Sequence, residues 1–329
     1  MRRLLAACGV AASLAAAALA CTIAYSSYDD RFQPVEDGGL AAFVIDDAAI
    51  QAVAVTASDL FYATSRGIER APLDGAAPST WLTASGVEKL ATDGTGTIAW
   101  ATSTDNEIHQ AYVASPGSAA VVSTTRLGQF SKLASDAAHF AWASVPPANC
   151  PCELGEVRGW QGVSAQAVDY DGGVKTFAQD VAVDGQGVTF FAPSLGFRRF
   201  AFDGTFVCGR PAGVGDQGAP GALHAIASGP DGTPFFAIAP TSGAAGPLLR
   251  YETACDDAGT EIDPNASAVM ADETNLFWIT SGGALETAGL DGGAGRIVPL
   301  SGAAAAMTSD AAFVYVAVGD RIFRIAKTP

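Results

Sequence analysis

The chain has 329 residues, of which 49% are hydrophobic and 16% are charged, and its 34 acidic and 18 basic residues give a net charge of −16. This hydrophobic content excludes an intrinsically disordered chain, and the acidic charge excludes a nucleic-acid partner, because phosphate binding needs clustered Lys and Arg. The 37 Gly and 17 Pro interrupt the sequence too often for long helices, so the composition predicts a turn-rich body.

The N-terminus has the pattern of an export signal. Two basic residues, Arg2 and Arg3, precede an uncharged, Ala-rich run over residues 4–20. A membrane-spanning helix needs about 20 strongly apolar residues, so this run predicts a cleaved signal peptide over residues 1–20. We expect a flexible tether over residues 21–38 and the folded body over residues 39–329.

The residues at the expected cleavage site resemble a bacterial lipobox. Ala18-Leu19-Ala20-Cys21 ends in the Cys that such a box lipidates, although Leu19 stands two places before the Cys where the pattern prefers three. The resemblance implies membrane attachment through a lipid on Cys21, with plain secretion as the alternative. Thr22 is similar to an outer-membrane sorting residue. We therefore expect an exported protein, either an outer-membrane lipoprotein or one located in the periplasm or outside the cell.

A short pattern recurs along the rest of the chain: an Asp-containing turn, two or three large apolar residues, and then a small residue. With the second aromatic as the anchor, the copies are centred on Tyr62, Trp100, Trp142, Phe191, Phe236, Trp278 and Tyr315. Successive anchors lie 37 to 49 residues apart, which is typical of a propeller blade. The sequence therefore predicts an all-β protein, a seven-bladed β-propeller of four-stranded antiparallel blades.

Turns rich in Asp and Gly divide each copy into strands. Asp93-Gly94 and Asp184-Gly185 follow short runs of small apolar residues, whereas Asp74-Gly75 precedes an expected outer strand. Gly accepts positive φ, and the Asp carboxylate caps the turn. We expect the small-residue runs to form the innermost strands, because bulky side chains from several blades would collide there.

The two ends of the chain complement each other. The last copy supplies strands over residues 304–308, 313–317 and 321–326 and lacks a fourth, whereas residues 40–45 precede the first copy and belong to none. We expect this spare N-terminal strand to pair with the last strand and close the ring three plus one, which removes the open sheet edge. Six blades is the alternative count, and it would leave one anchor unused.

The aromatic strands and Asp-Gly turns resemble those of secreted propellers of the YWTD and NHL kind over about residues 40–327. The Ala- and Gly-rich copies look most like exported propeller lipoproteins of myxobacterial type. This resemblance implies a fold, and nothing in its motifs implies a reaction.

One turn resembles an enzyme motif. Residues 226–232 are similar to the I-x-x-G-P-D-G turn of streptogramin lyases and related lactonase-like propellers, which would imply an enzyme with a divalent metal in the channel. His224 is the candidate ligand, since it lies in an expected innermost strand, but a lone polar channel residue is the favoured interpretation. The sequence contains no G-x-S-x-G, H-E-x-x-H or Walker motif, so we expect no catalytic residue and no cofactor.

Four cysteines lie beyond Cys21: Cys150, Cys152, Cys208 and Cys255. Export implies an oxidising compartment, in which disulfides form. The first two lie in an expected loop between the second and third strands of a blade, and the other two lie near turns on the opposite face. We favour the pairs 150–152 and 208–255 among the three possible pairings. A two-Cys metal site at residues 150 and 152 is the alternative.

The longest interval between anchors contains a loop over residues 145–155, and long loops on a rigid scaffold often carry binding residues. Candidate binding residues are Pro146, Asn149, Glu153 and Trp160, although burial of Trp160 in a strand is the favoured alternative. We expect a monomeric, non-catalytic binding or scaffolding module of the bacterial cell envelope, with an envelope protein or glycan as partner and contact with the membrane only through the lipid. A passive surface-coat component is a third hypothesis.

Overall fold

A computed structural model gives the arrangement of the chain. It describes residues 33–34, 41–44, 49–124, 129–145, 156–161, 168–170, 178–192, 196–210, 222–239, 245–252, 259–293 and 295–327. Residues 1–20 and most of the predicted tether lie outside these ranges. Within them the regular elements are β-strands, and no helix has the length and apolar character needed to cross a membrane.

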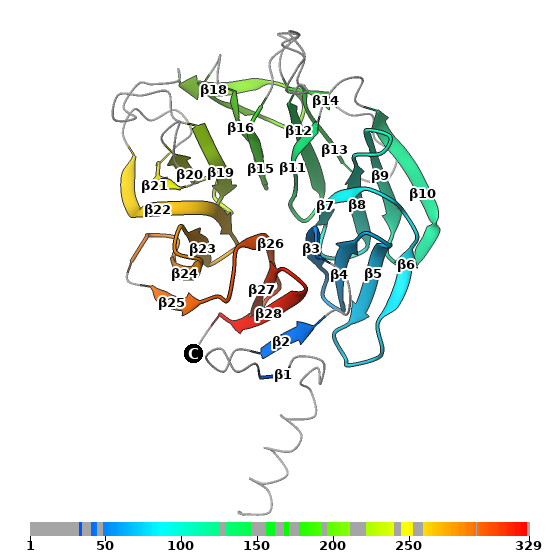
Figure 1. Cartoon of the computed structure of the whole chain (residues 1–329). Helices are drawn as coiled ribbons and strands as arrows, with labels where there is room; N and C mark the ends of the chain where they lie inside the picture. Colours follow the sequence, from blue (N-terminus) through cyan, green and yellow to red (C-terminus); the bar gives the residue numbers. More distant parts are fainter. Residues whose placement is uncertain are drawn as a thin grey trace, which may run out of the picture.

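Four sheets, each of four consecutive antiparallel strands, follow one another along the chain (Figure 1). The first two contain β3 (Ala52–Val55), β4 (Asp59–Thr64), β5 (Gly67–Pro72) and β6 (Ser79–Leu82), then β7 (Val87–Thr92), β8 (Thr97–Thr102), β9 (Glu107–Tyr112) and β10 (Ser115–Thr124). The next two contain β11 (Gln129–Ser135), β12 (His139–Val145), β13 (Glu156–Gln161) and β14 (Val168–Asp169), then β15 (Asp180–Asp184), β16 (Gly187–Ala192), β17 (Gly196–Phe200) and β18 (Phe206–Arg210).

A seven-stranded sheet comes next, because one long strand takes part in two groups of four. Its strands are β19 (Ala222–Ser228), β20 (Pro234–Ala239), β21 (Gly246–Arg250), β22 (Thr260–Ala271), β23 (Asn275–Thr280), β24 (Ala284–Gly289) and β25 (Arg296–Pro299). The first half of β22 pairs with β21, and its second half pairs with β23. The same strand is therefore outermost in one group and innermost in the next.

The last sheet joins the two ends of the described chain. It contains β26 (Ala304–Ser309), β27 (Phe313–Val318) and β28 (Arg321–Ala326), together with β2 (Ala41–Val44) and β1 (Gln33–Pro34). β2 pairs antiparallel with β28, with Ala41 opposite Arg324 and Val44 opposite Arg321. The N-terminal strand β2 thus lies beside the third strand of the last copy, in the position of the fourth strand that this copy lacks.

Apolar clusters fill the spaces between neighbouring sheets. The second strand of each group carries one large residue that packs against the sheet before it: Tyr62, Trp100, Trp142, Phe190, Phe236, Trp278 and Val316. For Tyr62 the preceding sheet is the last one, because its cluster contains Tyr315 and Ile322. The sheets are therefore packed in sequence, and the first packs on the last.

Two of the predicted anchors pack between neighbouring sheets as the others do, but against the following sheet. Phe191 shares a cluster with Phe236, and Tyr315 shares one with Tyr62, so each faces the following sheet. Their neighbours Phe190 and Val316 face the preceding sheet. The reason is that successive side chains of a strand point to opposite faces, so that the larger ring does not mark the face by itself.

A carboxylate holds the turn that follows most of the innermost strands. The turn residues are Thr56, Asp93, Asp136, Asp184, Gly229, Asp272 and Asp310 in chain order. Each of the five aspartates accepts at least one backbone N–H within its own turn, and Thr56 Oγ1 does the same in the first copy. These turn carboxylates account for part of the acidic excess, and they stabilise the turns of the fold.

Asp93 accepts three of these hydrogen bonds, so replacing it tests how much they contribute to stability. Its Oδ1 accepts the N–H groups of Thr95, Gly96 and Thr97 at 2.9, 2.8 and 2.9 Å. We expect Asp93→Ala to lower the free energy of unfolding by about 1–3 kcal/mol, because these donors lose their partner. Urea denaturation measures this loss.

The control is Asp74→Ala, since exposed Asp74 accepts, among the described residues, only the N–H of Ala76. We expect this variant to cost no more than about 0.5 kcal/mol. Burial alone would raise the pKa of Asp93, but the N–H bonds outweigh it and hold the pKa below its usual value. The stabilisation is therefore complete above about pH 4 and lost as the pH falls further. An equal cost of both variants at pH 7 would contradict this account.

Candidate functional site

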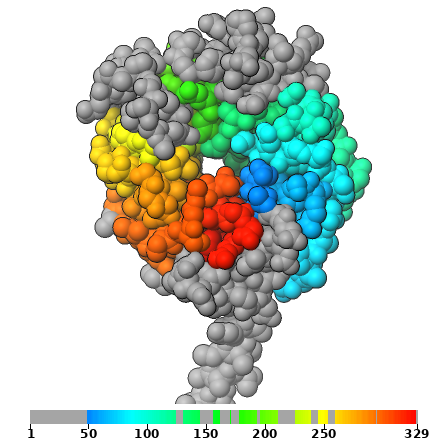
Figure 2. Space-filling model, in the orientation of Figure 1, coloured from blue at the N-terminus to red at the C-terminus, as the bar shows by residue number. Residues whose placement is uncertain are grey.

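A cavity of about 600 Å³ lies where the innermost strands meet. In the part of the chain that the structure describes, it is lined by β3, β7, β11, β15, β19, β22 and β26 and by the turns that follow them. Figure 2 shows the molecule hollowed at this point. The strands contribute mainly apolar side chains: Val53, Leu90, Leu133, Val181, Ile226, Val269 and Met307.

The innermost strands share one register position, four residues before the turn residue. In five strands the residue at this position directly follows a shift in the pairing register with the second strand. These residues are Lys89 in β7, Lys132 in β11, Ala225 in β19, Ala268 in β22 and Ala306 in β26. In the other two strands it is Ala52 and Asp180. Ala thus stands here in four copies, and charged residues stand here in three consecutive ones.

Lys132 reaches across from β11 to the next two innermost strands. Its Nζ lies 3.2 Å from Asp180 Oδ1 and 3.3 Å from Asp180 Oδ2, and it donates to the carbonyl of Ile226 at 3.4 Å. The Asp180 carboxylate also accepts the N–H groups of Val181 and Ile226, each at 2.7 Å. These contacts tie three neighbouring strands together at one level of the cavity.

Burial shapes the electrostatics of these three side chains. The Asp180 side chain is 5% exposed and that of Lys132 is 32% exposed. Burial raises the pKa of Asp180, against the opposing effect of Lys132 and the two N–H groups. The pKa of Lys89 is lowered, chiefly by burial, with Lys132 adding to the effect and Glu88 and Asp180 opposing it.

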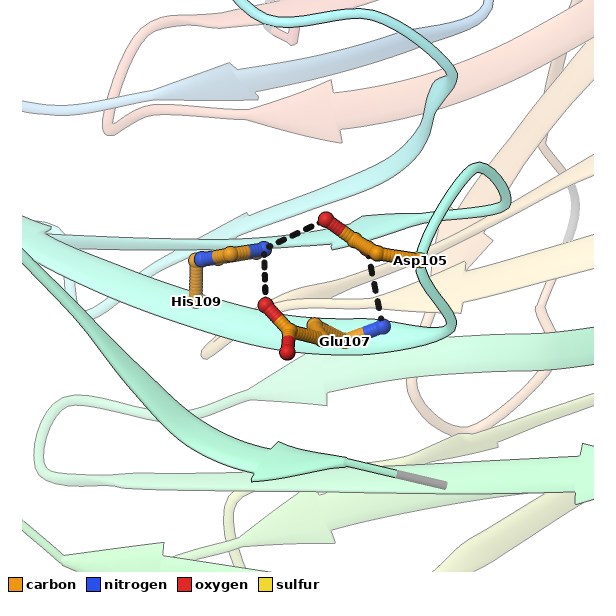
Figure 3. A group of neighbouring side chains, drawn as sticks. All are labelled: Asp105, Glu107 and His109. Atoms are coloured by element: carbon orange, nitrogen blue, oxygen red, sulfur yellow. Dashed lines mark hydrogen bonds and ion pairs between the residues drawn. The ribbon is translucent and has the colours of Figure 1, made fainter. Parts of the chain in front are cut away.

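A second cluster of ionisable groups lies on β9 and the turn before it (Figure 3). His109 Nε2 lies 3.4 Å from Glu107 Oε2 and 3.6 Å from Asp105 Oδ2. Glu107 and His109 are two residues apart on a strand and therefore share a face. The left-handed backbone of Asn106 (φ 57°) turns the chain between Asp105 and Glu107.

The neighbours of this cluster fix its geometry. The His109 ring stacks on Trp100 with the ring centroids 5.3 Å apart and an angle of 9°. Burial alone would raise the pKa of Asp105, but hydrogen bonds from Thr102 and the Glu107 N–H and the nearby His109 lower it. One ligand atom from each of Asp105, Glu107 and His109 lies within 4.8 Å of the others, so these three side chains could hold a divalent cation.

The candidate metal ligand of the sequence, His224, is the residue at the pairing shift in β19. Its side chain lies outside the described parts, so a metal site in the channel stays a prediction. The Asp105 cluster is on β9, which is not an innermost strand. The two metal hypotheses therefore concern different parts of the molecule.

Trp160 is a core residue, which agrees with the favoured interpretation that it is buried in a strand. It is 3% exposed, packs with Phe140 and Trp142, and donates its Nε1–H to Gln110 Oε1 at 2.7 Å. This removes Trp160 from the candidate binding residues. The other candidates, Pro146, Asn149 and Glu153, lie outside the described residues.

Of the candidate cysteines, the structure describes only Cys208, which lies in β18 and takes part in a disulfide bond. Cys150, Cys152 and Cys255 lie outside the described residues. The pairings 150–152 and 208–255 therefore stay predictions, as does the lipidation of Cys21.

Sequence reasoning missed Lys89, Lys132 and Asp180. A usable signal was present, because each precedes a turn aspartate by four residues: Asp93, Asp136 and Asp184. Aligning the copies on this turn residue, in place of the aromatic, brings the three charges to the position that is Ala elsewhere.

Comparison with known proteins supports the fold. No known protein-family model matches the sequence, and no curated protein matches it. Among solved structures, the computationally designed Ika8 protein is similar with a TM-score of 0.55 and 12% identity, covering 90% of this chain and 99% of that one. A chain of a nidogen/laminin complex is similar with a TM-score of 0.46 and 12% identity, covering 76% of this chain and 80% of that one. The likeness to Ika8 shows a β-propeller-like fold and no function.

The Lys132–Asp180 pair gives a testable result. Lys132→Met leaves a buried carboxylate without its counter-charge, so we expect a loss of about 3 kcal/mol in the free energy of unfolding at pH 7. Because the folded pKa of Asp180 is raised, its protonation relieves this cost, and the loss shrinks as the pH falls towards about 4. Urea denaturation at several pH values measures both effects.

The double variant Lys132→Met/Asp180→Asn is the matched control. Because neither member of the ion pair is charged any longer, it should recover most of the stability and lose the pH dependence that Asp180 causes. No recovery, or a loss that is the same at pH 7 and pH 4, would contradict the proposed pairing.

Proposed function

We propose that this chain is a non-catalytic binding propeller of the bacterial cell envelope, exported and anchored by a lipid on Cys21, that takes its ligand in the central cavity. The observation that carries the binding role is that Lys132 lines the cavity from a register position at which four copies have Ala, and that it pairs there with Asp180 of the next sheet. Charges on the innermost strands cost stability where Ala does not, so this ion pair is better explained by a ligand than by folding alone.

We further propose that the fold is a ring of seven blades closed by the N-terminal strand. Seven apolar clusters among the described residues each join two successive groups of strands, and one of them joins the first group to the last. The pairing of β2 with β28 supports a last blade built from both ends of the chain. A closed ring leaves no sheet edge to pair with another chain.

The envelope location and the lipid anchor rest on the sequence of residues 1–22. The variant Cys21→Ser tests them. We expect the wild-type chain to incorporate labelled palmitate and to sediment with membranes, and the variant to do neither while still being exported. A wild-type chain that is exported but unlabelled would overturn the anchor and support plain secretion.

The binding role is tested by capture from a native envelope extract on the immobilised mature protein, with bound small molecules, glycans and proteins identified by mass spectrometry. We expect one component to be retained by the wild type and lost with the double variant Lys132→Met/Asp180→Asn. The control Arg66→Met removes a positive charge that is 61% exposed, and it should retain the component.

A component retained equally by all three proteins would contradict the cavity as the binding site. Its loss on deletion of residues 146–155 would then place the site in the predicted loop. The absence of any retained component would contradict the binding role itself.

A further inference from the structure

We propose that Asp105, Glu107 and His109 form a binding site for one Zn²⁺ ion on the third strand of the second sheet (Figure 3). This strand, β9, is not among the innermost strands that line the cavity. The metal site is therefore separate from the cavity in which we place the ligand of the proposed binding function. Three features support it: the spacing of the ligand atoms, the charges around them, and the contrast with the next sheet.

The three ligand atoms are too far apart for strong hydrogen bonds and suitably spaced for a shared metal ion. His109 Nε2 lies 3.4 Å from Glu107 Oε2 and 3.6 Å from Asp105 Oδ2, whereas a charge-assisted hydrogen bond of a ring nitrogen to a carboxylate is about 2.7–2.9 Å long. Bonds of about 2.0–2.2 Å from Zn²⁺ to nitrogen and oxygen, at tetrahedral angles, place two ligand atoms about 3.4 Å apart. The imidazole thus lies at the distance from both carboxylates that a zinc ion between them requires.

No lysine or arginine balances the negative charge of this group. Within the part of the chain that the structure describes, His109 is the basic side chain that contacts Asp105 and Glu107, and no Lys or Arg forms an ion pair with either. Two carboxylates this close to each other repel. A divalent cation compensates both charges at once and becomes the largest charge of the site.

Neighbouring groups hold the ligands in place and leave the required atoms available. The Thr102 hydroxyl and the Glu107 N–H both donate to Asp105 Oδ1, and so Oδ2 is left to face His109. Stacking on Trp100 fixes the plane of the imidazole ring. The Asp105 side chain is 46% exposed, so an ion can enter from solution and a water molecule can supply a fourth ligand.

The third strand of the next sheet, β13, shows a different use of the same positions. Glu156 occupies the register position that Glu107 has in β9. Arg158 occupies the position of His109, and its Nη2 lies 3.5 Å from Glu156 Oε1. In β13 a permanent positive charge therefore balances the carboxylate. In β9 the same position has an imidazole, which can ligate a metal ion.

The donor set favours Zn²⁺ over Ca²⁺ and Mg²⁺. Imidazole nitrogen is a good ligand for Zn²⁺, whereas Ca²⁺ takes about six to eight oxygen ligands and Mg²⁺ also prefers oxygen. The cluster offers one nitrogen and two carboxylates. Together with a water molecule, these ligands complete a four-coordinate zinc site.

Isothermal titration calorimetry of the untagged protein, after removal of metal ions with a chelator, tests this site. We expect one Zn²⁺ ion to bind per chain, at least about tenfold more tightly than Ca²⁺ or Mg²⁺. The variant Glu107→Gln keeps the size of the side chain and removes its charge, so it should weaken Zn²⁺ binding by about tenfold or more.

The matched control is Glu156→Gln, because Glu156 has the same register position and its side chain is 28% exposed, against 26% for Glu107. It should leave Zn²⁺ binding unchanged. Zn²⁺ should also raise the thermal unfolding temperature of the wild type and of Glu156→Gln more than that of Glu107→Gln, because a ligand stabilises the folded state that binds it. A merely structural Glu107 would change the unfolding temperature of the metal-free protein and leave the affinity for Zn²⁺ as it is.

Zn²⁺ binding that survives Glu107→Gln would overturn this site, and its loss on His224→Ala would then place the ion in the channel. Binding of Ca²⁺ or Mg²⁺ as tight as that of Zn²⁺ would overturn the zinc assignment. If none of the three ions binds, the metal site is wrong and the cluster is an ion pair between His109 and the two carboxylates. The proposed ligand of the cavity is unaffected by each of these results.

Discussion

The structure depends on packing one large side chain of each sheet against the sheet before it. Tyr62, Trp100, Trp142, Phe190, Phe236, Trp278 and Val316 occupy equivalent positions in seven apolar clusters of the described residues. This repeated contact brings the innermost strands together around one cavity. Four copies have Ala at the shared register position, so Lys89, Lys132 and Asp180 are exceptions within the repeat.

Much of the fold could be predicted from the sequence, because anchor spacing and turn chemistry are local properties. The recurring aromatic residues predicted the four-stranded groups, and the orphan segment at residues 40–45 predicted a strand that pairs at the C-terminal end, which β2 does with β28. The sequence did not predict which neighbouring sheet Phe191 and Tyr315 contact, because adjacent apolar residues leave the direction of each side chain undecided until the pairing register is known.

The charged positions of the cavity depend on the same register. Lys89 and Lys132 each follow a shift of one residue in the pairing of their strand, and spacing between aromatic anchors carries no information about such shifts. The ion pair between Lys132 and Asp180 joins residues 48 positions apart in different sheets. Such a contact depends on how the sheets are arranged around the cavity. The sequence therefore predicts the fold more readily than it predicts this ion pair.

The central claim is that the repeated packing contact also joins the first sheet to the last and so surrounds the cavity. The most direct measurement is a double-mutant cycle, in which Tyr62→Ala on β4 and Ile322→Ala on β28 are made singly and together and the free energy of unfolding is measured by urea denaturation. The account predicts that the loss in the double variant differs from the sum of the single losses by at least about 0.5 kcal/mol, because the two side chains belong to one cluster. Additive losses would contradict it.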